Sequence, residues 1–202
     1  MDEFELIKAA KSGELDAFNR LILAYQDIAY NVAYRMLGDA DNAADATQIA
    51  FINAFRHVKS FRGGSFRAWI LRIVTNACYD SLRQYKRKPT TTLEPVDQDD
   101  ETLESPRWMV DPGESPEETL LRSELARAIQ HCLDRLTPDF RAVVVMIDIQ
   151  GFDYAEAASV LKKPLGTIKS RLARARSRMQ QCLQAFRELL PSAFRLGEES
   201  VL

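Results

Sequence analysis

The sequence predicts an all-α protein of two small helical domains, joined by an acidic flexible linker, with a helix-turn-helix in the C-terminal domain. Apolar residues recur at steps of three and four along most of the chain, and no stretch shows a convincing strand pattern. Residues 90–115 hold three prolines and little periodicity, which is typical of a linker. We therefore expect domains at residues 1–88 and 116–190, a linker at 89–115 and a tail at 191–202.

Four helices are expected in the N-terminal domain, at about residues 4–11, 14–37, 39–57 and 66–87. Gly38 is the expected left-handed residue after the second helix, and Asp39 or Asp41 is the expected N-cap of the third. In that third helix we expect Ala46, Ile49, Ala50, Phe55 and Val58 to be buried. Ser65 follows a loop and caps the fourth helix, which Pro89 ends.

The helix at 66–87 has two different faces at about 100° per residue. One face is apolar and fits a core, whereas the opposite face carries Trp69, Arg72, Asn76 and Tyr79. Aromatic rings interleaved with an amide and cations are what stacking on unpaired bases while holding the backbone requires. The alternative, that Trp69 and Tyr79 pack against a neighbouring helix, stays open.

In the C-terminal domain, Ser115-Pro116 and Thr137-Pro138 each give a helix start signal, and Asp153 caps a short third helix. Residues 162–166 break that helix, Gly166 permits the turn, and Thr167 caps a longer helix. The longer helix has an apolar stripe at steps of three and four, made of Ile168, Leu172, Ala175, Met179, Leu183 and Phe186. The short and the longer helix together are predicted to form a helix-turn-helix.

Charge is distributed in blocks that the net charge of −2 conceals. Residues 61–88 carry +6, residues 89–124 carry −9, and residues 161–187 carry +8 with no acidic residue at all. A solvated helix face usually mixes signs, so the last block favours a polyanionic partner, although a plain basic surface is the alternative. A helix-turn-helix places its second helix in the major groove, and we predict that this one reads DNA.

Several classes of protein are not expected. No run approaches the ~20 apolar residues of a membrane span, and the N-terminus lacks the basic start of a signal peptide, which indicates a cytoplasmic protein that is not membrane-embedded. Cys78, Cys132 and Cys182 are far apart and form no CxxC, which predicts neither a disulfide nor a zinc site. With two histidines and no catalytic motif, we expect no enzyme, catalytic residue, metal, cofactor or small-molecule substrate.

Four ordered segments resemble a known family. Residues 44–51 (ADATQIAF), 66–76 (FRAWILRIVTN), 136–138 (LTP) and 166–176 (GTIKSRLARAR) are similar to motifs of bacterial RNA polymerase sigma factors of the extracytoplasmic-function (ECF) group. That group keeps only the second and fourth conserved sigma regions, which would correspond to residues 1–88 and 116–190. The order and spacing of four segments are far more specific than a helix-turn-helix alone.

The resemblance implies partners and a role for each site residue. The partners would be core RNA polymerase, promoter DNA and an anti-sigma factor, with Asp45 and Gln48 on the face that grips the polymerase. The melted −10 element would meet Phe61, Arg62, Gly63, Ser65, Trp69, Arg72, Asn76 and Tyr79. The −35 duplex would be contacted by Lys169, Ser170, Arg171, Arg174 and Arg178.

Two alternatives to a sigma factor are a self-sufficient DNA-binding regulator and a helical adaptor. A repressor or activator could use the same helix-turn-helix with the N-terminal helices as a ligand or dimer domain, but it leaves the basic and aromatic helix at 66–87 unexplained. A helical adaptor without a nucleic-acid role leaves the +8 block unexplained. Duplex binding by the purified protein alone would favour the repressor.

Overall fold

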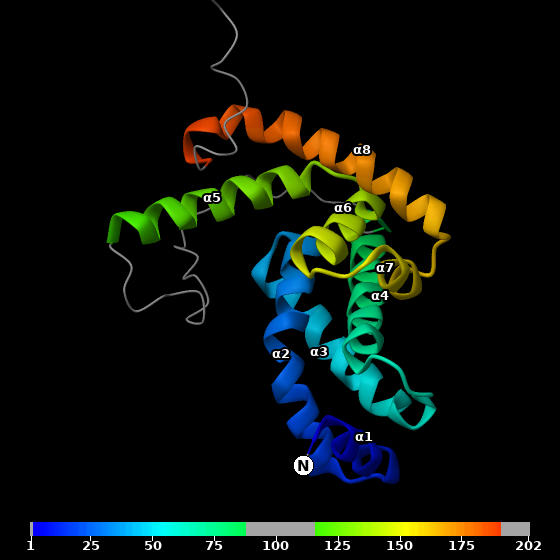
Figure 1. The fold of residues 1–202 in the computed structure, drawn as a ribbon. Coiled ribbons are helices and arrows are strands. Elements are labelled where there is room, and N and C mark those ends of the chain that lie inside the picture. Colours follow the sequence, from blue (N-terminus) through cyan, green and yellow to red (C-terminus); the bar gives the residue numbers. More distant parts are fainter. Residues whose placement is uncertain (1, 88–115, 191–202) are drawn as a thin grey trace, which may run out of the picture.

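The computed structural model describes residues 2–87 and 116–190, and within these ranges every regular element is a helix, which confirms the all-α prediction. Two helical domains are present (Figure 1). The predicted linker and tail lie outside the described residues. In chain order the elements are α1 (Glu3–Ser12), α2 (Leu15–Leu37), α3 (Ala40–His57), η1 (Val58–Ser60), α4 (Phe66–Arg87), α5 (Pro116–Asp134), α6 (Pro138–Val144), η3 (Val145–Ile149), α7 (Tyr154–Leu161), α8 (Leu165–Leu183) and η4 (Gln184–Leu189).

The N-terminal domain is a bundle of α2, α3 and α4, with α1 packed against α2 at the lower end in Figure 1. The boundaries follow the predicted capping signals. Asp39 is the N-cap of α3, and its side chain accepts a hydrogen bond from the backbone N–H of Asn42 at 2.7 Å. Gly38 ends α2 in the left-handed conformation at φ 77°. The largest fully buried side chains of this domain include Leu21, Met36 and Phe66.

The expectation that Ile49 and Phe55 are core residues is wrong. Ile49 is 53% exposed and Phe55 is 48% exposed. The predicted burial of Ala46, Ala50 and Val58 is confirmed. The reason for the difference is that the buried face of α3 is a stripe of small residues, made of Ala43, Ala46, Ala50 and Ala54. Alanine allows α2 and α4 to approach α3 closely on both sides, so the larger apolar residues of α3 remain at the surface.

In the C-terminal domain, α8 packs across α6 and α7 and runs beside α5 (Figure 1). The turn before α8 differs from the prediction. Lys162 takes the left-handed conformation at φ 50°, and α8 begins at Leu165 directly after Pro164. Gly166 and Thr167 therefore lie in the first turn of α8, because a proline fits the start of a helix and needs no amide hydrogen there.

A disulfide joins Cys132 of α5 to Cys182 of α8, so the prediction of no disulfide is wrong. The two residues are 50 positions apart in the sequence, but α5 and α8 lie side by side in antiparallel orientation (Figure 1), which brings their Cα atoms to 5.7 Å. Cys78 is a free thiol in the core of the N-terminal domain, and burial raises its pKa to about 12.

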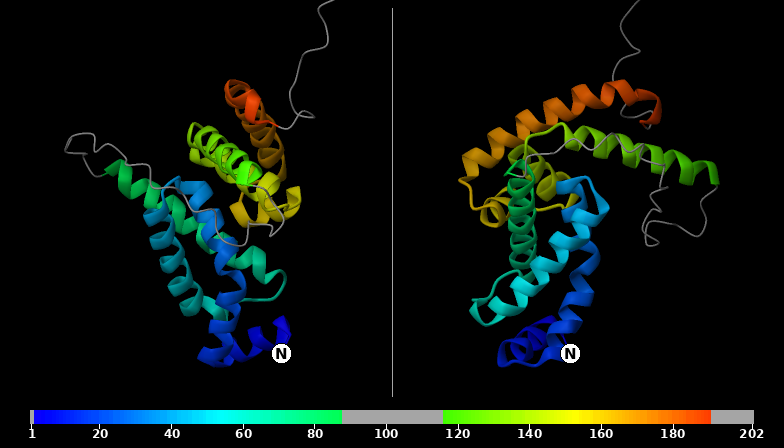
Figure 2. Two further views of the ribbon diagram at one scale, coloured as in Figure 1. Left: turned by 90° about the vertical axis from the view of Figure 1, so that its left-hand side faces the viewer. Right: turned by 180° about the vertical axis from the view of Figure 1, so that it is seen from behind.

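The two domains pack directly against each other. The helix α7 lies against α4, while α5, α6 and η3 meet the C-terminal end of α2 (Figure 2). At that end, the Arg141 guanidinium donates to the backbone oxygens of Met36 (2.6 Å) and Asp134 (2.8 Å). Since the last carbonyls of a helix have no partner within the helix, a buried arginine from the other domain satisfies one of them.

Candidate nucleic-acid interface

The helix-turn-helix formed by α7 and α8 presents a basic face to solvent. Asp153 and Glu156 form a capping box that begins α7. On α8, Ile168, Leu172 and Ala175 are buried, which turns the other side of the helix outward. Four of the five residues predicted for the −35 element are exposed on α8, namely Lys169, Ser170, Arg174 and Arg178.

The basic side chains of α8 differ in the contacts that they make within the protein. The Lys169 ammonium lies 5.7 Å from the centre of the Tyr154 ring, and the Arg178 guanidinium lies 4.9 Å from that of Phe140. These aromatic faces orient the two cations without neutralising them. Among the described residues, no hydrogen bond or ion pair engages the Arg174 side chain, which leaves all its donors available.

Arg171 is the predicted −35 residue that is only partly exposed. Its guanidinium forms an ion pair with Asp139 at 2.7 Å, and 24% of its side chain is exposed. Arg176 similarly pairs with Asp148 at 2.5 Å, and the hydrogen bonds that its guanidinium donates to this carboxylate raise the pKa of Arg176. Both acids lie in the C-terminal domain and reduce the free charge of α8.

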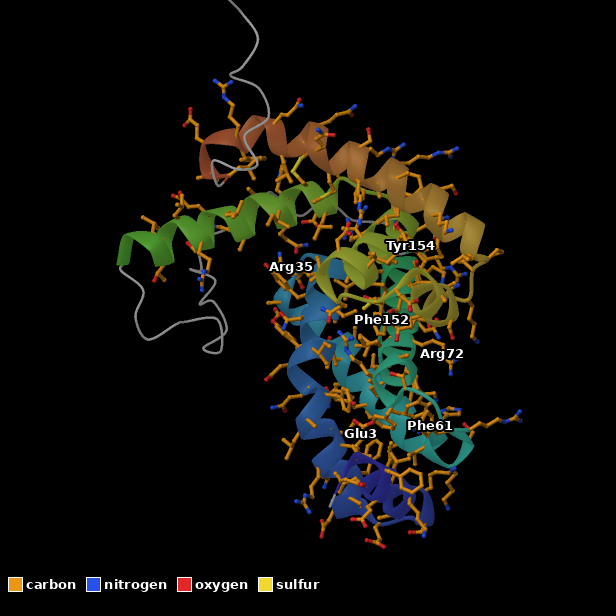
Figure 3. The ribbon with its side chains drawn as sticks, viewed as in Figure 1. Glu3, Arg35, Phe61, Arg72, Phe152 and Tyr154 are labelled. Atoms are coloured by element: carbon orange, nitrogen blue, oxygen red, sulfur yellow. A yellow bond between two sulfur atoms is a disulfide. The ribbon has the colours of Figure 1, made fainter. Side chains whose placement is uncertain are left out.

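The residues predicted for the −10 element fall into two groups. Phe61 and Trp69 are buried and form an aromatic cluster with Phe66, with ring centres 5.2–5.5 Å apart. The loop residues Arg62, Gly63 and Ser65 are exposed, as is Asn76 on α4, while Arg72 is half-buried. Figure 3 shows Arg72 on α4, Phe61 in the loop before this helix, and Phe152 and Tyr154 of the other domain close to α4. The exposed group is accessible from solvent, whereas the buried rings of Phe61 and Trp69 belong to the aromatic cluster.

Tyr79 lies where the two domains meet. Its hydroxyl donates to Asp139 at 3.2 Å, and burial together with this carboxylate raises its pKa. In the first turn of α4, about three turns before Tyr79, Arg67 donates to the backbone oxygen of Gln150 at 2.6 Å and lies 4.5 Å from the centre of the Phe152 ring. Contacts with the C-terminal domain are therefore found both at the first turn of α4 and near its middle.

Asp45 and Gln48 are exposed on α3 but line different hollows. Gln48 lines a groove of about 710 Å³ between α2 and α3, whose floor and walls are apolar and include Phe18, Ile22, Phe51, Ile52 and Phe55. Asp45 lines a separate hollow of about 680 Å³ between α3 and α4, next to Ile49. Sequence reasoning assigned Ile49 and Phe55 to the core together with Ala46 and Ala50, although only the two alanines lie on the buried face.

A second apolar groove of about 770 Å³ lies between α5, η3 and α8 in the C-terminal domain. Its lining includes Leu133 and Leu183, the neighbours of the two disulfide-bonded cysteines. Within the described ranges 2–87 and 116–190, no helix is long and apolar enough to cross a membrane, and no cluster of three His, Cys, Asp or Glu residues could hold a metal.

Comparison with known proteins assigns a family to both domains. The model for "Sigma-70 region 2" matches residues 21–88, and that for "Sigma-70, region 4" matches residues 126–179. The RNA polymerase sigma-H factor of Pseudomonas aeruginosa is 33% identical over 181 residues, which are 89% of this chain and 93% of that protein. This chain belongs to the ECF RNA polymerase sigma factors. The sigma factor therefore has a role in transcription initiation.

Other relatives agree with this sigma factor over most of its length. SigW of Bacillus subtilis is 34% identical over 179 residues, which are 88% of this chain and 95% of SigW. SigE of Mycolicibacterium smegmatis is 36% identical over 169 residues, which are 84% of this chain but only 62% of SigE. The sigma factor thus spans nearly the full length of some relatives and less than two thirds of another.

Solved structures share the fold of the sigma factor. CnrH, solved in complex with the cytosolic domain of CnrY, has a TM-score of 0.62 and 26% identity, and the match covers 89% of this chain and 96% of CnrH. RpoE, solved in complex with the anti-sigma factor NepR from Bartonella quintana, has a TM-score of 0.61 and 23% identity, with 84% of this chain and 98% of RpoE covered.

Proposed function

We propose that this sigma factor directs promoter-specific initiation by reading the −35 duplex with α8 and melted −10 DNA with α4 and the loop before it. The observation that carries the proposal is the exposed face of α8, where Lys169, Arg174 and Arg178 point outward from the second helix of a helix-turn-helix. Arginine recognises guanine through two donors, and the neighbouring cations suit phosphates. The function is one of binding, and no chemical step by this chain is needed.

For the −10 element, the exposed loop at residues 62–65 and Asn76 support the capture of unpaired bases. Gly63 and Gly64 both have positive φ angles (94° and 87°), which folds the loop into a form that bulkier residues rarely adopt. Asn76 offers an exposed amide that can accept and donate hydrogen bonds to a base edge. Arg62 supplies a cation for the backbone beside them.

For core RNA polymerase, the α2–α3 groove supports a docking surface with apolar and polar parts. Ile52 and Phe55 are 45% and 48% exposed, which is unusual for large apolar residues unless a partner covers them. Gln48 lies in the same groove, and Asp45 lies one turn earlier on the exposed side of α3. We propose that this side of α3 contacts the polymerase, in the cytoplasm where transcription takes place.

An anti-sigma factor is the second proposed protein partner. RpoE, which shares this fold, was solved in complex with an anti-sigma factor. The exposed apolar grooves of both domains give such a protein surfaces for which it would compete with the polymerase.

The −10 assignment is tested with Asn76→Ala. Because Asn76 is exposed, the substitution should leave the fold and the binding of core polymerase intact while open complexes decrease. The measurement is permanganate reactivity of the −10 thymines, with co-purification of polymerase in parallel. Gln84→Ala removes an exposed amide from the same helix and is the matched control. Equal loss of polymerase binding and of open complexes would indicate a folding defect.

DNA binding by the purified protein, without polymerase, distinguishes a sigma factor from a self-sufficient repressor. A repressor binds its duplex tightly and specifically without polymerase, whereas a sigma factor should bind promoter DNA specifically only in the presence of core polymerase. A gel shift with both mixtures distinguishes the two functions.

A further inference from the structure

One carboxylate connects the two surfaces that we assign to DNA. Asp139 accepts a hydrogen bond from the Tyr79 hydroxyl through Oδ1 at 3.2 Å and pairs with Arg171 through Oδ2 at 2.7 Å. Tyr79 lies on α4 in the N-terminal domain, and Arg171 lies on α8 in the C-terminal domain. Asp139 therefore engages a candidate −10 residue and a candidate −35 residue at the same time.

We propose that Asp139 is an internal latch that holds the free chain closed and competes with DNA phosphate for Arg171. The proposal rests on the proposed function, since it takes α4 and α8 as the helices that meet DNA. In the closed chain Asp139 takes the role of a phosphate, because a carboxylate offers the guanidinium the same kind of charged oxygen acceptors. When Arg171 moves to a DNA phosphate, Asp139 loses its ion pair and keeps only its hydrogen bond with Tyr79.

The position of Asp139 suits a latch that opens. It is the second residue of α6, where the partial positive charge of the helix N-terminus favours a carboxylate. The Asp139 side chain is 44% exposed and that of Arg171 is 24% exposed, so water and salt weaken the pair. Such a pair biases an equilibrium between closed and open states, yet a polyanion can displace it.

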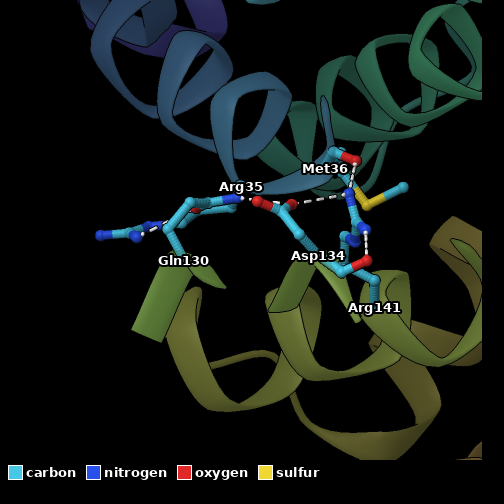
Figure 4. A network of polar contacts seen from close by, with 5 residues as sticks. All are labelled: Arg35, Met36, Gln130, Asp134 and Arg141. Atoms are coloured by element: carbon cyan, nitrogen blue, oxygen red, sulfur yellow. Dashed lines mark hydrogen bonds and ion pairs between the residues drawn. The ribbon is translucent and has the colours of Figure 1, made fainter. Parts of the chain in front are cut away.

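Other contacts fix how the domains meet at the end of α2. Figure 4 shows a polar network in which Arg35 donates to Gln130 at 3.1 Å and Arg141 donates to the Met36 backbone oxygen at 2.6 Å. Asp134 connects the two halves, since it accepts from Gln130 at 3.1 Å and pairs with Arg141 at 3.2 Å. These residues dock the domains but include no candidate DNA contact, which distinguishes them from Asp139.

The closed state has different effects on the two DNA surfaces. On α8, Lys169 and Arg174 remain exposed, so a duplex can still approach. On α4, Tyr79 is half-buried and the helix is packed against α7. Duplex binding that draws Arg171 away from Asp139 therefore favours the exposure of α4 for melted DNA. By linkage, contact of melted DNA with α4 favours duplex binding to the same extent.

The test compares Asp139→Asn with Asp148→Asn in the full chain. Both changes remove one negative charge that pairs with an arginine of α8, but only Asp139 also contacts the N-terminal domain. The first readout is the radius of gyration by small-angle X-ray scattering across a salt series. The second is the affinity for a labelled single-stranded oligonucleotide, which reports exposure of α4. Tyr79→Phe removes the other side of the bridge and should shift the scattering series in the same direction.

We expect Asp139→Asn to expand at lower salt than the wild type and to bind the single strand about two- to fivefold more tightly, while Asp148→Asn resembles the wild type in both. Identical scattering series for Asp139→Asn and Asp148→Asn would overturn the latch. So would a radius of gyration that stays at the closed value at every salt concentration in the wild type and in all the variants. Expansion of Asp139→Asn without single-strand binding by any variant supports the latch and contradicts the proposed role of α4. If Asp139→Asn fails to fold, the scattering of Tyr79→Phe decides.

Discussion

At the scale of single residues, arginines divide into those that hold the domains together and those that face solvent. Arg35 and Arg141 donate across the domain boundary, and burial lowers the pKa of both guanidinium groups. Arg174 and Arg178 are exposed on α8. The planar guanidinium serves both purposes because its five donors can bind backbone carbonyls, carboxylates, bases or phosphates.

Arg174 provides the sharpest prediction at this scale. If it contacts a base with two hydrogen bonds, Arg174→Ala should cost about 1–3 kcal/mol at the upstream element and relax specificity there. If Arg178 contacts a phosphate, Arg178→Ala should weaken binding to all sequences alike and lower the salt slope by about one. The measurement is transcription from a cognate promoter and a scrambled one. Arg127→Ala, at an exposed position of α5, controls for the loss of charge. Unchanged promoter preference in Arg174→Ala would contradict the assignment of α8.

At the scale of elements, α3 combines a buried alanine stripe with exposed apolar residues beside a groove. Ile52→Asp should therefore disturb the fold little, since Ile52 is 45% exposed. It should reduce affinity for core polymerase about tenfold or more, because an apolar contact is lost and a charge is buried instead.

Co-purification with core polymerase measures the effect of Ile52→Asp. Leu23→Asp is the control, since Leu23 is 64% exposed on α2 and does not line the groove. The same loss of polymerase in both variants would show that the α2–α3 groove is not the docking surface.

The disulfide between α5 and α8 provides a second prediction about elements. A cross-link that closes a loop of this length stabilises a domain by about 2–4 kcal/mol, mainly through the unfolded state. We expect a reducing agent to lower the free energy of unfolding of the C-terminal domain by that amount in the wild type. The Cys132→Ser/Cys182→Ser variant should be insensitive to the reagent.

Counting thiols checks the disulfide independently. The unfolded, unreduced protein should show one thiol per chain, from Cys78, and three after reduction. In the native protein Cys78 should react slowly, because burial raises its pKa to about 12 and leaves very little thiolate at neutral pH. Three thiols before reduction would contradict the cross-link.

Helices and their ends were largely predictable because they depend on neighbouring residues. The cap of α3 by Asp39 and the end of α2 at Gly38 follow from local chemistry, and so does the buried stripe of α8. The disulfide and the covering of Tyr79 were not predictable, since they depend on how helices distant in sequence lie side by side. The exposure of Phe55 was missed because hydrophobicity alone does not separate core from docking surface.

At the scale of the whole molecule, the two domains of the sigma factor pack against each other. As a result, the two candidate DNA surfaces differ in how far they are exposed to solvent. The face of α8 is open, whereas α4 is partly covered by α7. Polymerase and promoter would have to separate the domains far enough for both surfaces to work at once. The order of charges along the chain, with two basic blocks on either side of an acidic one, fits two DNA contacts joined by a spacer.

Run-off transcription with core RNA polymerase and this chain tests the central claim most directly. We expect the mixture to start transcripts at defined positions on genomic templates, with start sites that share an upstream and a downstream element. Arg174→Ala should reduce initiation through the upstream element, and Asn76→Ala should reduce it through the melted one. Core polymerase that gains no defined start sites, while the chain alone binds duplex DNA tightly and specifically, would contradict the account.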